Sequence, residues 1–285
     1  MKKTQIIGIG AAIIIGFAYV GTKMYASSIA EEKIDIAIAN LVNYVDVDYR
    51  NVSVDLLGFD VHVSDIVVSA INSKDKINID EIVVFDVDKE SDIPFFLHIA
   101  LNGIQIPIDQ IEAVKKLGYN DYMLLNADIE YDYNKNEKEI VLNRIQVGAD
   151  GVGDIEISLR LSNIDLNPEN LLAFLFTYPQ IMLHNATIMY RDDSFIERLM
   201  KLQAENQDRD VTQVKDDIIT IIEHTIEDEE DEFTKNVLTE IRKFINAPEE
   251  FSISIEPIKP LPLGRIMRTK NPKDLIKILN IRIQS

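Results

Sequence analysis

Hydrophobic and polar residues alternate along most of the chain between residues 45 and 190, as in residues 97–101 and 155–161. A period of two is typical of β-strands with one buried face, because successive side chains point to opposite faces of a sheet. Turn-forming residues separate one alternating run from the next. The pattern therefore predicts a largely antiparallel β meander.

A short motif interrupts this alternation at intervals of 16 to 22 residues, with one longer interval of 41, and has apolar residues at positions i, i+3 and i+5. The period slips once at each copy, which predicts either a β-bulge or a tight turn. We expect a turn at Asn102-Gly103 and bulges at Asp80-Glu81 and Asn143-Arg144. Many slips in series would bend the sheet into a trough. The copies begin at Val63, Ile79, Leu101, Leu142, Leu161 and, more loosely, Leu183.

A helical pattern follows, because apolar residues recur every three to four positions in three stripes from Phe195 to about Ile245. Pro248 ends the last predicted helix. A strand at residues 251–255 comes next. Three prolines between residues 257 and 262 then mark an edge strand or an extended arm.

The first residues carry a different pattern, an uncharged apolar run from Ile6 to Gly21 that follows Lys2 and Lys3. Its length approaches the ~20 residues that a membrane-spanning helix needs. The preceding lysines predict a cytoplasmic N-terminus, with the rest of the chain on the far side. The residues expected to anchor the chain are Ile6, Ile7, Ile13, Ile14, Ile15 and Phe17.

Two alternatives stay open for this segment. A cleaved signal peptide would need a small-x-small cleavage site, and Met24 and Ala26 form a poor one. Gly8, Ala12 and Gly16 would line one face of the helix and permit close approach of a second helix. Glycine and alanine are also common in membrane helices generally, so the stripe need not mark a partner.

The predicted fold class is α+β: an N-terminal transmembrane helix, then a bent, largely antiparallel β meander with a helical insert near the C-terminus. The expected divisions are a transmembrane anchor (1–25), a juxtamembrane helix or linker (26–44), the repeated β meander (45–190), a helical section (191–247), and a strand with a Pro-rich arm and a basic tail (248–285).

Amino-acid composition and net charge exclude several classes of site and partner. The 285-residue chain has no cysteine, which excludes disulfides, thiolate nucleophiles and cysteine-ligated metals. Its net charge of −19 makes nucleic acid an improbable partner, because phosphates would be repelled. The last 21 residues nevertheless carry six cations against Asp274. We expect this basic tail to meet the acidic body of the same protein; anionic lipid headgroups are the alternative.

No motif for catalysis is found. The four histidines are scattered without the i, i+4 spacing of zinc hydrolases, and neither a nucleophile elbow nor a P-loop is present. The acidic run at residues 227–232 lacks the spacing of a calcium loop and is read as a solvated junction between helices. The sequence therefore predicts no catalytic residue, cofactor or metal, and a non-enzymatic role.

The N-terminal anchor, the repeated motif and the β-rich body resemble the AsmA-like envelope proteins of Gram-negative bacteria. Residues 186–199 and 244–257 resemble the C-terminal part of related uncharacterised envelope proteins. The resemblance implies a place in the bacterial inner membrane, with the C-terminal domain in the periplasm. It also implies a role in envelope assembly or lipid movement, and it supplies no catalytic residues. This chain is short for a protein that bridges the whole periplasm.

These observations lead to a single-pass membrane protein that maintains the envelope or handles lipid, with acyl chains or a partner's helix on a concave apolar β surface. One alternative is a structural adaptor with a closed core, which would recruit an envelope protein through its acidic surface or through the small-residue stripe of its anchor. An envelope hydrolase is a third possibility that a single sequence leaves open.

Overall fold

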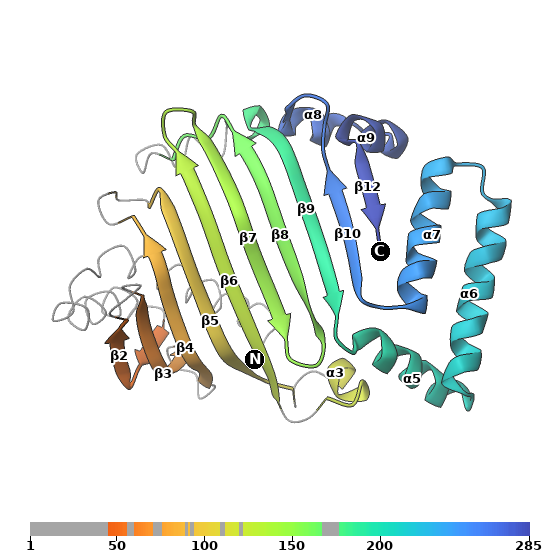
Figure 1. Ribbon diagram of the computed structural model, residues 1–285, viewed down its shortest axis with the longest axis horizontal. Coiled ribbons are helices and arrows are strands. Elements are labelled where there is room, and N and C mark those ends of the chain that lie inside the picture. The colour runs from red at the N-terminus through yellow and green to blue at the C-terminus, as the bar shows by residue number, and fades with distance from the viewer. Residues whose placement is uncertain are drawn as a thin grey trace.

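The computed structural model describes residues 45–55, 60–70, 76–88, 91, 94–108, 112–119, 122–166 and 177–285. Within them, one large twisted sheet is flanked at one edge by helices (Figure 1). The expectation of a largely antiparallel sheet accompanied by several helices is confirmed. The predicted anchor residues (Ile6, Ile7, Ile13, Ile14, Ile15 and Phe17) and the stripe of Gly8, Ala12 and Gly16 lie outside the described residues.

The strands follow one another across the sheet in the order β1-β3-β4-β5-β6-β7-β8-β9-β10-β12, and every neighbouring pair is antiparallel. β2 pairs with β3 beside β1, and the short β11 pairs with β9. The strands are β1 (Val45–Asp48), β2 (Asn51–Val54), β3 (Val61–Ala70), β4 (Lys76–Val87), β5 (Phe96–Pro107), β6 (Tyr122–Asn134), β7 (Glu139–Ala149), β8 (Gly153–Ser162), β9 (Met182–Asp192), β10 (Glu250–Ile255), β11 (Leu261–Pro262) and β12 (Ile281–Gln284).

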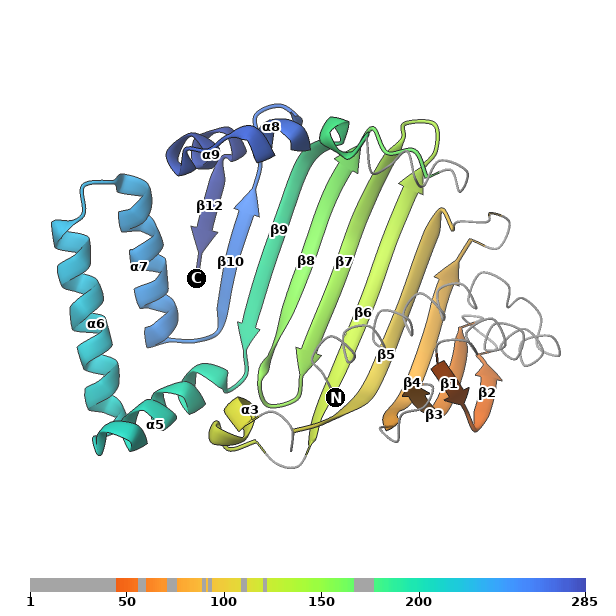
Figure 2. The same ribbon diagram turned by 180° about the vertical axis from the view of Figure 1, so that it is seen from behind.

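Three longer helices separate β9 from β10, yet these two strands pair directly. They are α5 (Phe195–Gln207), α6 (Val211–Asp228) and α7 (Glu232–Asn246), and they lie beyond the β12 edge of the sheet (Figures 1 and 2). Asp210 and Asp231 accept backbone hydrogen bonds at the starts of α6 and α7, as helix N-caps do. The short elements are α3 (Glu112–Lys116), the 3-10 helix η2 (Tyr178–Gln180), α8 (Leu263–Arg268) and α9 (Pro272–Leu279).

Five of the six slips in the hydrophobic pattern are irregularities inside long strands, and the slip after Leu161 lies at the end of β8. The predicted turn at Asn102-Gly103 is wrong: β5 continues through both residues, which lie opposite the single Asn126 of β6. Gly103 has φ +67° and donates its N–H to Asn126 Oδ1 at 2.9 Å, so the pair forms a bulge. The bulge predicted at Asn143-Arg144 is confirmed, because these residues lie opposite Ser158 alone on β8.

The slips of neighbouring strands coincide at one level of the sheet. The flanking pairs place Asp65 of β3, which has φ 55°, opposite Asp80 of β4. They likewise place Asp80 opposite Gly103 of β5. Because all three strands slip together there, their mutual register does not change at this level, and the bulge predicted at Asp80-Glu81 is not formed against either neighbouring strand. The register shifts at the β5–β6 boundary, where β6 keeps a strict period of two. Apolar residues on both sides of each slip therefore face the same way.

Candidate functional site

One face of the sheet is apolar from β3 to β12. Residues directly opposite one another on paired strands point to the same face, with side chains about 5 Å apart. A first ladder across nine strands consists of valine and isoleucine alone. Its members are Val61, Val84, Ile99, Ile129, Ile145, Ile157, Ile188, Ile253 and Ile283.

A second ladder runs beside the first on the same face. Its members are Val63, Ile82, Leu101, Ala127, Val147, Ile155, Tyr190 and Phe251. A third ladder of mostly aliphatic residues crosses from Val87 on β4 to Ile281 on β12. The face is therefore a continuous apolar surface with no charged residue in either of the first two ladders.

The exposure of this surface changes sharply along its width. Ile82 and Ile99, on β4 and β5, are 0% exposed and belong to a core cluster of β1 to β6. Farther along the same two ladders, Val147 is 47% exposed, Ile155 48% and Ile188 42%. These three neighbours on β7, β8 and β9 define the surface that we call the apolar strip. Large exposed apolar side chains that cluster in this way mark binding surfaces.

Two tyrosines of the apolar face, Tyr131 and Tyr190, bring no charge to it. Tyr131 donates its hydroxyl to Pro94 O at 3.0 Å, and Tyr190 donates to Asp192 Oδ1 at 2.6 Å. Burial, together with the charge of Asp88, raises the pKa of Tyr131 to about 12. Burial, followed by the hydrogen bond to Asp192, also raises the pKa of Tyr190. Both phenols stay neutral at physiological pH, so the surface stays uncharged.

The helical section meets the apolar face near the start of β10. Phe244 of α7 lies 6.0 Å from the ring of Tyr190 and 5.6 Å from that of Phe251, measured between ring centroids. These contacts cover the end of the second ladder, because Tyr190 and Phe251 are its last two members. The neighbouring Ile155 remains about half exposed.

The opposite face of the sheet is polar and internally paired. Arg191 of β9 forms ion pairs with Asp154 at 3.0 Å, Glu156 at 3.2 Å and Glu250 at 3.6 Å. Arg144 of β7 similarly reaches Asp128 at 2.8 Å, and His98 stacks on Phe85 nearby. The alternation of the strands thus places charges on one face and hydrocarbon on the other.

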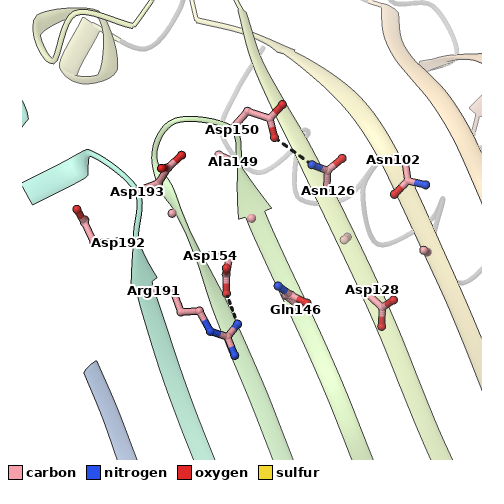
Figure 3. A pocket seen from close by; sticks show the side chains of 14 residues that line it. Asn102, Asn126, Asp128, Gln146, Ala149, Asp150, Asp154, Arg191, Asp192 and Asp193 are labelled. Carbon is pink, nitrogen blue, oxygen red and sulfur yellow. Dashed lines mark hydrogen bonds and ion pairs between the residues drawn. The ribbon is translucent and has the colours of Figure 1, made fainter. Parts of the chain in front are cut away.

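A hollow of about 550 Å³ lies on the polar face near the β7–β8 hairpin (Figure 3). Its side chains form hydrogen bonds with one another. Asn126 Nδ2 donates to Asp150 Oδ1 at 3.2 Å, and Arg191 Nη1 donates to Asp154 Oδ2 at 3.0 Å. Within the described residues, no group of histidine and acidic side chains could hold a metal ion. The charged lining makes this hollow unsuitable for an apolar ligand, so the apolar strip is the stronger candidate site.

A family model described as an uncharacterized protein matches residues 146–285. No curated protein matches the chain. The matched part is just under half of the chain and extends from the middle of β7 to the last residue. It contains all three residues of the apolar strip.

Sequence patterns predicted an apolar sheet face but did not single out Val147, Ile155 or Ile188 as site residues. The available signal was the alternation itself, which is the same for exposed and buried members of a ladder. Among the described residues, no helix has the length and apolarity needed to cross a membrane. Chemically, the strip offers van der Waals and hydrophobic contact to a flexible apolar ligand.

Proposed function

We propose that this protein is a non-enzymatic, single-pass protein of the bacterial inner membrane whose periplasmic domain handles lipid on a concave apolar β surface. The observation that carries the proposal is the exposure of Val147, Ile155 and Ile188 on a continuous apolar face. Burying such side chains against an acyl chain gains roughly 25 cal/mol for each Å² removed from water. Neighbouring strands are ~4.8 Å apart, so the surface from β6 to β10 is about 19 Å wide.

The membrane location rests on the sequence, through the apolar run from Ile6 to Gly21 and the preceding lysines. The resemblance to AsmA-like envelope proteins supports the same location and a role in envelope maintenance. The sheet supports the choice of ligand, because a polar ligand would prefer the opposite face. The partner envisaged is the acyl part of a membrane lipid.

Site-specific photocrosslinking tests the proposal, because the chain has no native cysteine to interfere. Ile155→Cys places a benzophenone maleimide on the apolar strip of the full chain, purified in mild detergent from its own membranes. Ser158→Cys, on the same strand but on the opposite face, is the matched control. Native mass spectrometry with lipid extraction then identifies the adducts.

Lipid adducts at position 155 that exceed those at position 158 several-fold would support lipid handling. Equal labelling at the two positions would contradict it. A protein adduct at position 155 without lipid would favour the adaptor instead, with the strip covered by a partner.

A further inference from the structure

The end of the chain concentrates positive charge on an acidic protein. Residues 257–285, which we call the basic end, carry seven lysines and arginines and one carboxylate, Asp274, in a chain of net charge −19. They comprise the loop after β10, then β11, α8, α9 and β12. In Figure 1, α8 and α9 lie together at one end of the strands.

This end is held firmly on the sheet. Leu263 donates its N–H to Ile181 O at 2.8 Å, and Gly264 packs so closely on Pro179 that an added Cβ would lie 2.8 Å from the proline Cβ. Leu261 and Leu279 are buried in a cluster with Leu183 of β9. The charges on α8 and α9 are therefore displayed from a fixed platform.

The acidic body of the protein pairs with few of these charges. Lys273 Nζ lies 3.1 Å from Asp231, and Arg282 lies 3.4 Å from Glu256. The remaining five cations have no carboxylate within ion-pair distance among the described residues. They are Lys259, Arg265, Arg268, Lys270 and Lys277. The expectation that the basic tail mainly meets the body of its own protein therefore fails for most of its charges.

Exposed apolar side chains lie among these cations. Ile258, in the loop before β11, is 92% exposed, and Met267 of α8 is 65% exposed. Lys259 follows the first directly, and Arg268 follows the second. Exposed apolar side chains next to lysine and arginine are the combination with which peripheral segments enter the boundary of an anionic bilayer.

We propose that the basic end docks on an anionic lipid bilayer, with Arg265, Arg268 and Lys270 at the headgroups and Ile258 and Met267 inserted between them. The bilayer is the occupant that fits, because it complements both the charge and the two protruding hydrocarbon side chains. The proposal stands independently of ligand binding by the apolar strip. Its consequence for the fold is that one end of the sheet faces the membrane.

The absence of cysteine again gives a direct test. A Met267→Cys variant labelled with the environment-sensitive dye NBD is reconstituted as the full chain into vesicles with 0, 20 or 40% phosphatidylglycerol in phosphatidylcholine. Ile221→Cys on α6, also 65% exposed, is the matched control. Emission at position 267 should rise and shift to the blue as phosphatidylglycerol increases, while emission at position 221 should stay unchanged.

Removing charge should reverse the response. Each of Arg265→Gln and Lys270→Gln should lower the ratio of docked to undocked protein roughly five-fold, since one cation near an anionic surface contributes about 1 kcal/mol. Salt added to 0.5 M should also lower the ratio of docked to undocked protein, because it screens the attraction between the cations and the anionic lipids. An Ile258→Cys label provides a second reporter if the label at position 267 disturbs α8. Labels at both positions that remain in water at every composition would overturn the proposal and leave an acidic protein as the partner.

Discussion

Val147 on β7 lies directly opposite Ile155 on β8, and each keeps almost half of its surface in water. Ile82 belongs to the same ladder and is fully buried. A charged substitution should therefore affect stability differently at Ile82 and at Ile155. This difference gives the first prediction.

Ile82→Asp should lower the free energy of unfolding by several kcal/mol or prevent folding, because it buries an unpaired carboxylate. Ile155→Asp should cost no more than about 1 kcal/mol, because its carboxylate can reach water. Urea unfolding followed by circular dichroism would measure both. Equal losses would mean that position 155 is as enclosed as position 82.

Gly103 and Gly151 offer a matched test of the bulge in β5. Their φ values are +67° and +68°, so alanine meets the same backbone penalty of roughly 1 kcal/mol at either site. At Gly103 an added Cβ would also lie 2.8 Å from Asp80 Cβ, whereas at Gly151 nothing lies within 4 Å. Gly103→Ala should therefore destabilise the protein by at least about 1 kcal/mol more than Gly151→Ala in thermal unfolding. Identical melting temperatures for the two variants would show that Asp80 moves aside without cost.

Glu240 of α7 makes stability depend on pH. Its carboxylate accepts hydrogen bonds from Lys243 Nζ at 2.7 Å and from Ser285 N at 3.1 Å. The hydrogen bond from Lys243, opposed in part by burial and reinforced by those from Ser285, lowers the pKa of Glu240 below its ordinary value. A lowered pKa in the folded state means that this stabilisation is present above the unfolded pKa of about 4.3 and is lost as pH falls through the folded pKa.

The difference in stability between the native protein and Glu240→Gln should therefore be constant from pH 7 to pH 5 and shrink towards pH 3. Chemical denaturation at five pH values would measure it. Glu232→Gln on the same helix is the control, because that side chain is 90% exposed and should show little change. A difference that grows on acidification would contradict the assignment.

Arg191 of β9 should stabilise the sheet by pairing with three carboxylates of the two neighbouring strands, β8 and β10. Arg191→Met keeps the length of the side chain but leaves Asp154, Glu156 and Glu250 to repel one another. We expect a loss of about 1 kcal/mol in low salt and a smaller loss in 1 M NaCl, where screening weakens the repulsion. Urea midpoints of the native protein and the variant at the two salt concentrations would measure this loss. A loss of stability that salt does not change would instead be due to altered packing.

The strands and helices could be predicted because their signals are local. Alternation marked the strands, and a period of three to four residues, with Pro248 after the last stripe, marked the helices. The turn predicted at Asn102-Gly103 failed because the dipeptide suits a bulge as well as a hairpin, and Asn126 on another strand decides between them.

The candidate site could be predicted only in part. The sequence indicates that Ile99 and Ile188 lie on an apolar face, since both follow the same alternation. It does not indicate that the first is buried and the second 42% exposed, because this depends on what lies above each strand. The sequence also does not indicate that the cations of α8 and α9 mostly lack ion-pair partners, since ion pairing depends on distances between segments far apart in sequence.

From β3 to β9, each strand pairs with the strand that precedes it in the sequence and the strand that follows it. A hairpin inserted anywhere in this series would keep the direction of every other strand and widen the sheet by two strands. The number of strands is therefore a quantity that duplication or deletion of a hairpin can change in one step. A family built on this plan could vary its width, and with it the length of any surface that crosses the strands, while keeping the same chain path.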